Sequence, residues 1–122
     1  MSNVTGFGGL FFRADDPDAL SAWYEKHFNI SSVQNGLWIQ KEGPTVFAPF
    51  KKDTNYFGSQ EQQFMINLRV TDLDELLKEL QAAGTRIDEK RQDEPYGRFA
   101  WVYDPEGNKI ELWQPAATGV EK

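Results

Sequence analysis

The stretch DPEGNKIELW, residues 104–113, predicts a tight turn followed by a strand. Pro105 and Gly107 suit a type I turn that closes a hairpin, and the apolar and polar residues after them alternate as in a strand with one buried face. Glu111 lies in the middle of that strand, between aliphatic neighbours that point the other way. The sequence therefore raises the question whether Glu111 binds a metal ion or has another partner.

The composition predicts one domain that covers residues 1–122. A chain of 122 residues can bury a core without disulfides or structural zinc. It contains no cysteine, which excludes disulfides, thiolate metal sites and thiol nucleophiles. The first residues lack a secretory signal, and no apolar segment approaches the roughly 20 residues of a membrane span, so we expect a cytoplasmic protein without membrane contact.

The charge and the aromatic content narrow the class of partner. The chain has 13 Lys and Arg against 19 Asp and Glu, and its net charge of −6 argues against nucleic acid. Its 4 Trp, 9 Phe and 4 Tyr either fill a core or line a small-molecule cavity, and composition alone leaves both open. The expected partner is a small molecule.

The two halves of the chain resemble each other. LFFRADDPDAL (10–20) aligns with INLRVTDLDEL (66–76), and LWIQKEG (37–43) aligns with WVYDPEG (101–107). Each half predicts a strand, an Asp that caps a helix, the helix itself and three further strands. The expected boundaries are 5–49 for module 1, 50–62 for a linker loop and 63–115 for module 2, with strands near 7–14, 31–34, 37–41, 44–49, 63–70, 86–90, 98–103 and 108–114 and helices near 17–28 and 73–83.

This pattern predicts an α+β fold in which each helix covers one side of its own sheet. Alternation along the strands directs residues such as Leu68 toward the helix and leaves Arg13, Asn67 and Arg69 on the opposite face. Polar residues are unusual on a buried face and ordinary in a cleft. The face away from the helices is therefore the predicted ligand site.

The repeat and its final motif resemble the vicinal oxygen chelate superfamily, which contains glyoxalase I, bleomycin-resistance proteins and extradiol dioxygenases. The Asp-Pro-acid-Gly turn followed by Ile-Glu-Leu is the most specific part, and YGRFAWVYDPEGN (96–108) also resembles small bacterial glyoxalase-like proteins. The resemblance implies two βαβββ modules whose open, mixed sheets curl around a cleft, with one helix on the outer face of each module. It further implies a homodimer and a metal ion bound by four side chains.

The four ligand positions that the resemblance implies fall on Gly9, Phe47, Met65 and Glu111. Only Glu111 offers an oxygen, because a phenyl ring binds no such cation, a thioether suits Cu(I), and glycine has no side chain. A divalent ion bound by one carboxylate would be coordinated mostly by water and would bind weakly. We therefore expect neither a metal nor another cofactor. His27 lies on the first predicted helix and is interpreted as structural.

The remaining cleft is predicted to be aromatic, with a few polar groups, which is the usual form of a ligand site. Its charges have two open interpretations: Arg69 pairs with Glu111, or Arg13 and Arg69 together grip an anionic group. Arg13 has the further alternative of an ion pair with Asp15 or Asp16. The predicted ligand-binding residues are Phe11, Arg13, Phe47, Met65, Asn67, Arg69, Tyr96, Phe99, Trp101, Glu111 and Trp113.

Two aromatic segments outside the strands are candidates for the rim of the cleft. Tyr96 either hangs over the cleft mouth or is a surface residue of its turn. Tyr56 and Phe57 lie in the linker loop, the segment most expected to move. No spacing rule supports either segment.

Three hypotheses about function follow. The preferred one is a metal-free glyoxalase-like protein that binds an aromatic or anionic small molecule, because the ligand positions do not suit glyoxalase I activity. The second is a metal-dependent lyase or dioxygenase in which Glu111 acts beside an ion held partly by unexpected residues. The third is metal-free catalysis with Glu111 as base and Arg69 or Tyr96 stabilising an oxyanion. A bleomycin-type role is weaker, since arginines in the cleft would repel a cationic drug.

Overall fold

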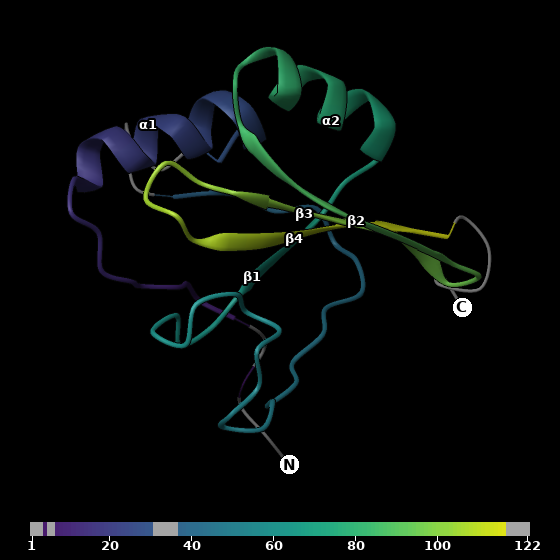
Figure 1. Ribbon diagram of the computed structural model, residues 1–122, viewed down its shortest axis with the longest axis horizontal. Helices are drawn as coiled ribbons and strands as arrows, with labels where there is room; N and C mark the ends of the chain where they lie inside the picture. The colour runs from purple at the N-terminus through teal and green to yellow at the C-terminus, as the bar shows by residue number, and fades with distance from the viewer. Residues whose placement is uncertain (1–3, 5–6, 31–36, 117–122) are drawn as a thin grey trace.

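The computed structural model describes residues 4, 7–30 and 37–116 (Figure 1). The predicted strand at 31–34 lies outside these residues. The elements, in chain order, are α1 (Pro17–Phe28), β1 (Ile66–Arg69), α2 (Leu73–Ala82), β2 (Arg86–Glu94), β3 (Gly97–Tyr103) and β4 (Lys109–Pro115).

The strands form one open mixed sheet in the order β1-β4-β3-β2. β1 runs parallel to β4, and the β4–β3 and β3–β2 pairs are antiparallel. This arrangement confirms the predicted α+β class. Within the described residues there is no helix with the length and apolarity that a membrane span requires.

Local signals explain where the helices begin and end. The Asp16 carboxylate accepts a hydrogen bond from the backbone N–H of Ala19 at 3.1 Å, and Asp72 does the same for Glu75 at 3.1 Å. Gly84 follows α2 with a φ of +84°, a conformation that glycine adopts without strain. Both helices therefore start at the capping residues that the repeat predicts.

Each module contributes one helix, as predicted, and both helices cover the same face of the described sheet (Figure 1), whereas the sequence predicts that each helix covers its own sheet. The described sheet consists of second-module strands, so its apolar face is the one available to both helices. Between helices and sheet lies a single hydrophobic cluster. Its buried members are Leu20, Tyr24, Leu68, Leu73, Leu80, Ala100, Val102, Ile110 and Leu112.

The described residues 7–14 and 37–49, where the sequence predicts three strands, contain none. A strand requires a neighbour that completes its hydrogen-bond ladder, and no such ladder joins these segments to the sheet. The carbonyls of Lys41 and Pro44 instead accept hydrogen bonds from the Arg69 guanidinium. The second-module strands form as predicted, and β2 continues beyond its predicted end at residue 90.

The turn of the opening motif is organised around one buried carboxylate. Asp104 is 4% exposed, and its oxygens accept hydrogen bonds from the backbone N–H groups of Glu106 (2.9 Å) and Asn108 (3.0 Å) and from the Asn108 amide (2.8 Å). The hydroxyl of Tyr24, on α1, donates to the same carboxylate at 2.7 Å. Burial, then the contact with Asp104, raises the pKa of Tyr24 above its ordinary value. Asp104 thus joins the turn to α1.

Glu106, two residues later, makes a second connection to the same helix. Its carboxylate accepts the backbone N–H groups of Asp15 at 2.7 Å and Asp16 at 2.8 Å, directly before α1. These N–H groups lie at the positive end of the helix, where a negative charge is favourable. The DPEGN turn therefore fixes the start of α1 as well as the start of β4.

Tyr24→Phe is expected to lower the free energy of unfolding by about 1–3 kcal/mol, because the buried Asp104 carboxylate loses a donor. Urea denaturation measures the loss. Tyr103→Phe is the matched control: its hydroxyl donates to the half-buried Asp88, and its removal should cost less than about 1 kcal/mol. Equal losses in the two variants would contradict the role of Asp104.

Candidate functional site

The face of the sheet opposite the helices carries three of the predicted site residues side by side. Ala100 and Val102 of β3 are buried in the helix-side core, so Trp101 between them points to the other face. Trp101 pairs with Glu111 in β4, and Glu111 pairs with Asn67 in β1. An aromatic ring, a carboxylate and an amide therefore lie in one row across three strands.

A second row on this face is entirely aromatic. Phe99 of β3 pairs with Trp113 of β4, and their rings are stacked with an interplanar angle of 3° and centroids 6.1 Å apart. Tyr96 is 56% exposed and meets Phe99 edge-on at 5.9 Å. Three of the predicted aromatic residues of the second module, Tyr96, Phe99 and Trp113, thus contact one another in sequence.

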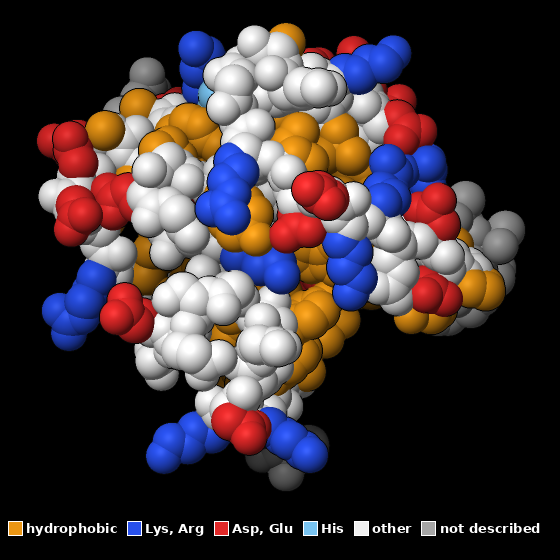
Figure 2. Space-filling view, in the orientation of Figure 1, with side chains coloured by type: hydrophobic (Ala, Val, Ile, Leu, Met, Phe, Trp, Pro, Cys, Tyr) orange, Lys and Arg blue, Asp and Glu red, His pale blue; other side chains and the backbone are white. Residues whose placement is uncertain are grey.

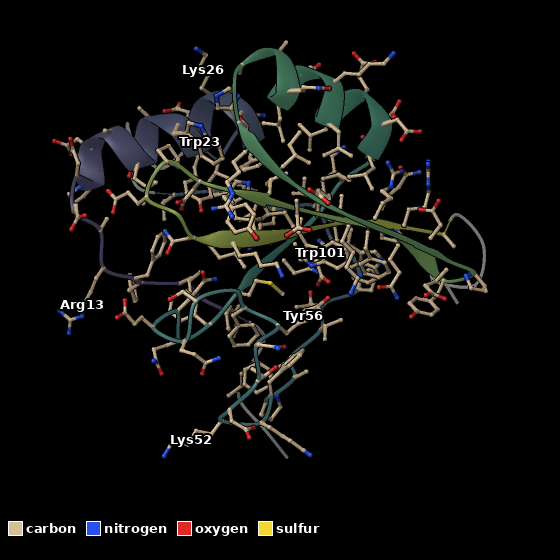
Figure 3. All side chains as sticks on the ribbon, viewed as in Figure 1. Arg13, Trp23, Lys26, Lys52, Tyr56 and Trp101 are labelled. Carbon is tan, nitrogen blue, oxygen red and sulfur yellow. The ribbon has the colours of Figure 1, made fainter. Side chains whose placement is uncertain are left out.

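Both oxygens of Glu111 accept hydrogen bonds from neutral donors. The hydroxyl of Tyr56 donates to Oε2 at 2.5 Å, and the amide of Asn67 donates to Oε1 at 2.6 Å. Tyr56 comes from loop 50–62, and Figure 3 shows it between this loop and Trp101 on the sheet. The two rings meet edge-on, with centroids 6.1 Å apart. Glu111 therefore connects the sheet to the loop.

The Tyr56 hydroxyl is held in its protonated form. Burial raises its pKa above the ordinary value, and the hydrogen bond and negative charge of Glu111 raise it further. The Trp101 side chain acts in the opposite direction and lowers this pKa. At neutral pH, Tyr56 is consequently a proton donor directed at Glu111.

Loop 50–62 is docked on the sheet. Lys109 donates from Nζ to the carbonyl of Tyr56 at 2.9 Å. The amide of Gln62 pairs with the Lys109 backbone, donating to its carbonyl at 3.0 Å and accepting its N–H at 2.9 Å. Phe50 stacks on Tyr56 with centroids 5.4 Å apart. The segment that the sequence predicts as a linker is therefore part of the site.

The two predicted arginines do not meet at Glu111. The Arg69 guanidinium donates to the carbonyls of Pro44 at 2.6 Å and Lys41 at 2.9 Å. Arg13 is exposed, forms no ion pair with any described residue and points away from the sheet in Figure 3. The predicted Arg69–Glu111 pair is not formed, and Arg13 and Arg69 share no partner among the described residues.

The remaining residues of the predicted site are two exposed phenylalanines of the first module and Met65 of the second. Phe11 is 93% exposed and Phe47 is 82% exposed. Gly9 lies next to the Phe11 ring, and half-buried Met65 directly precedes β1. Phe47 is too exposed to line an enclosed site in this structure, whereas Phe11 and Lys109 border an open hollow of about 280 Å³.

The side chains near Glu111 do not fit a divalent metal ion. In the part of the chain that the structure describes, no three His, Asp or Glu side chains are grouped so that they could hold one. The other three family positions, Gly9, Phe47 and Met65, offer no oxygen or nitrogen ligand. His27 lies on α1, where burial and then the charge of the adjacent lysine lower its pKa.

Two buried indole N–H groups on the Glu111 face have no hydrogen-bond partner among the described residues. Trp101 is 1% exposed and Trp113 is 9% exposed, and Nε1 of each lacks an acceptor. A buried donor without an acceptor is unfavourable. Each of these groups can therefore still donate to a further acceptor atom.

Sequence reasoning missed two basic residues at this face. Nζ of Lys90 lies 5.3 Å from the Trp101 ring centroid, and Nζ of Lys109 lies 5.9 Å from it. Lys109 precedes Glu111 by two positions in β4, so strand alternation alone would place it on the same face. Lys90 lies within the register shift between Ile87 and Arg91, which no sequence pattern indicates.

Comparisons with known proteins give one family model and several similar folds. The model of the Glyoxalase/Bleomycin resistance protein/Dioxygenase superfamily matches residues 6–112. The comparison with curated proteins finds no match. TnmS3, an antibiotic binding protein from Streptomyces sp. CB03234, has a solved structure that is 22% identical, covers 95% of this chain and 100% of its own, and gives a TM-score of 0.61.

Two further solved structures have the same fold. The lactoylglutathione lyase from Agrobacterium tumefaciens is 16% identical over 97% of this chain and 99% of its own, with a TM-score of 0.58. TioX from Micromonospora sp. ML1 is 22% identical over 84% of this chain and 93% of its own, with a TM-score of 0.51. At these identities the likeness concerns the fold alone.

The raised pKa of Tyr56 predicts a loss of stability at alkaline pH. Its contribution is complete below the ordinary tyrosine pKa of 10.0 and is lost as the pH rises toward the higher pKa of the folded state. Between about pH 9 and about pH 11, the melting temperature of the wild-type protein should therefore fall more steeply than that of Tyr56→Phe. Scanning calorimetry measures both slopes, and parallel slopes would contradict the prediction.

Proposed function

The chain belongs to the Glyoxalase/Bleomycin resistance protein/Dioxygenase superfamily, and on this premise we propose that it binds a small aromatic molecule without a metal ion. The binding surface is the Glu111 face of β3 and β4 together with loop 50–62. One observation carries the proposal: two groups of aromatic rings on one face of the sheet include two buried indole N–H groups that form no hydrogen bond with the described residues.

The aromatic surface supports a ligand that contains a flat ring. Aromatic rings prefer offset-stacked or edge-to-face contacts, and both geometries already occur here between protein rings. A ligand ring would extend the same packing. The contributing residues are Tyr96, Phe99 and Trp113 in one group and Phe50, Tyr56 and Trp101 in the other.

The indole groups support a ligand that also carries oxygen acceptors. A carbonyl or carboxylate oxygen placed at Nε1 of Trp101 or Trp113 would satisfy a buried donor, and each such hydrogen bond contributes about 0.5–1.5 kcal/mol. A few polar groups on apolar walls are what orients a ligand in most small-molecule sites. Glu111 adds to that orientation by fixing Tyr56 at the edge of the surface.

Independence from metal is proposed on the chemistry of the available side chains. Glu111 is the one family ligand position with a suitable oxygen, and both of its oxygens already accept hydrogen bonds. The fold is compatible with a binding role, since the similar TnmS3 is described as an antibiotic binding protein. These points favour a binding protein over a metal-dependent lyase or dioxygenase.

Metal-free acid-base catalysis is the second candidate, and the contact between Tyr56 and Glu111 favours it. A protonated phenol 2.5 Å from a carboxylate is a donor and acceptor pair that can move a proton to or from a bound compound. Tyr56 here takes the place that the sequence analysis gave to Arg69 or Tyr96. The reaction would need the same aromatic ligand in the same place.

We also propose that the protein acts as a cytoplasmic homodimer. Large apolar side chains are exposed in segments whose sequences favour strands but which join no ladder, including Phe11, Ile39 and Phe47. Burial of such exposed apolar surface is energetically favourable, and a second copy of the chain is the simplest partner that could bury it. The lack of cysteine suits a reducing compartment.

Isothermal titration calorimetry with aromatic acids, amides and quinones tests the binding function. We expect at least one of these classes to bind equally well with and without EDTA. Trp113→Phe should weaken binding by about fivefold to tenfold, because it removes the N–H and keeps a ring. Trp23→Phe, on α1 and away from the site (Figure 3), is the control and should bind as wild type. Loss of binding in EDTA, or no binding by any class, would overturn the proposal.

Glu111→Gln tests the catalytic alternative. If the Tyr56 and Glu111 pair moves a proton, this variant should lose turnover of a bound compound while its affinity stays within about threefold of wild type. Mass spectrometry of the ligand follows turnover. Asn67→Ala removes the other donor to Glu111 but leaves the proton pair, so it should retain activity. Turnover that survives Glu111→Gln would exclude the pair as the catalyst.

A further inference from the structure

We propose that the ligand of this site is an aromatic carboxylate, and that Lys90, Lys109 and the indole N–H of Trp101 hold its anionic group. The inference rests on the proposed binding function and adds the charge of the ligand to it. It replaces the two arginines of the sequence analysis, which the structure places elsewhere, with two lysines.

Two ammonium groups converge on one ring. Nζ of Lys90, from β2, lies 5.3 Å from the centroid of Trp101, and Nζ of Lys109, from β4, lies 5.9 Å from it. Lys109 also lies 5.3 Å from the centroid of Tyr56 and is fixed by its hydrogen bond to the Tyr56 carbonyl. In Figure 2, basic side chains lie beside hydrophobic ones in the middle of the view. Two positive charges therefore flank the aromatic surface.

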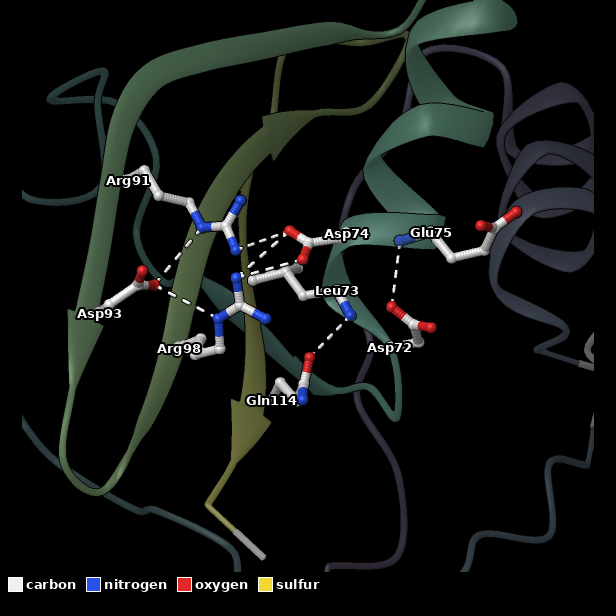
Figure 4. A network of polar contacts seen from close by, with 8 residues as sticks. All are labelled: Asp72, Leu73, Asp74, Glu75, Arg91, Asp93, Arg98 and Gln114. Atoms are coloured by element: carbon white, nitrogen blue, oxygen red, sulfur yellow. Dashed lines mark hydrogen bonds and ion pairs between the residues drawn. The ribbon is translucent and has the colours of Figure 1, made fainter.

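Neither lysine is neutralised by an ion pair within the described residues. The ion pairs found there all belong to a separate cluster, in which Arg91 and Arg98 contact Asp74 and Asp93 (Figure 4). There two arginines meet two carboxylates, so the charges balance. At Trp101 the two cations have no such partner, and they remain available to an anion.

The buried indole distinguishes these lysines from others on the surface. Trp101 is 1% exposed, and its N–H lies near the Tyr56 hydroxyl without a well-formed hydrogen bond, so a stronger acceptor that reaches it gains a hydrogen bond in a site of low polarity. A carboxylate oxygen is a stronger acceptor than a neutral one, and its second oxygen can face an ammonium group. The donor and the cations together match the chemistry of one carboxylate.

The nearby carboxylates form no ion pair with Lys90 or Lys109 within the described residues. Glu111 accepts hydrogen bonds from Tyr56 and Asn67, both neutral, rather than from a lysine side chain. Asp88 accepts the backbone N–H of Lys90 at 2.9 Å and the hydroxyl of Tyr103 at 2.9 Å. The pKa of Asp88 is lowered first by that backbone N–H, then by the Tyr103 hydroxyl and by the positive charges of Lys109 and Arg86. Asp88 and Lys109 therefore interact electrostatically without forming an ion pair.

Three ligands of one shape test the charge: 2-naphthoate, the neutral 2-naphthamide and the cationic 2-naphthylmethylammonium. Calorimetric titration of the wild-type protein should give a Kd for the carboxylate that is about tenfold lower than for the amide, with the ammonium compound weakest. The preference should shrink as NaCl is added, because salt screens the lysine charges.

Lys90→Met should reduce the preference for the carboxylate to about twofold without weakening the amide, since no hydrogen bond of the Lys90 side chain is lost. Lys52→Met is the matched control: Lys52 is exposed in loop 50–62 and points away from Trp101 in Figure 3, so it should keep the full preference. Lys109→Met provides a second variant, with its melting temperature measured because Lys109 also holds the loop.

The possible outcomes separate this inference from the binding function. Equal binding of carboxylate and amide, or a preference that survives both lysine substitutions, would overturn the anionic ligand and leave aromatic binding intact. Failure of all three compounds to bind would count against the binding function itself. A carboxylate preference lost in the lysine variants and kept in Lys52→Met would establish the inference.

Discussion

The buried carboxylate of Asp104 is the constraint on which the rest of the structure depends. A charge removed from water is tolerated only when donors surround it, and Asp104 has four hydrogen bonds, from Glu106, Asn108 and Tyr24. Three of them close the turn between β3 and β4, and the fourth comes from α1. The same carboxylate therefore sets the geometry of the hairpin and the position of the helix that covers it.

The geometry of that turn decides which side chains form the site. The turn fixes the register of β4 against β3, and the register directs Lys109, Glu111 and Trp113 away from the helices. A shift of one residue would exchange them for Ile110 and Leu112 and place charges in the core. Core packing and site assembly are thus two results of one register, so substitutions in the turn are expected to affect both stability and ligand affinity.

The sequence predicts the features that depend on neighbouring residues, and it does not predict the contacts between residues far apart in the chain. Helix starts at Asp16 and Asp72, the turn and the second-module strands follow from capping, turn and alternation rules that act over a few residues. The partners of Tyr56, Arg69 and Lys90 cannot be predicted from these rules. A contact with a loop carbonyl or with a ring of another strand produces no periodic pattern in the sequence. The predicted first-module strands fail for a related reason: strand-forming composition does not supply a neighbouring strand.

An anionic ligand in a protein with a net charge of −6 is consistent with the distances involved. At physiological ionic strength the screening length is about 8 Å, so charges elsewhere on the surface act weakly on the site. Lys90 and Lys109 lie within 6 Å of the Trp101 centroid and act at short range. The net charge then governs solubility and non-specific contacts, and the two lysines govern which ligand is held. Glu111 contributes by binding Tyr56 and Asn67, neutral donors, so it forms no ion pair with either lysine.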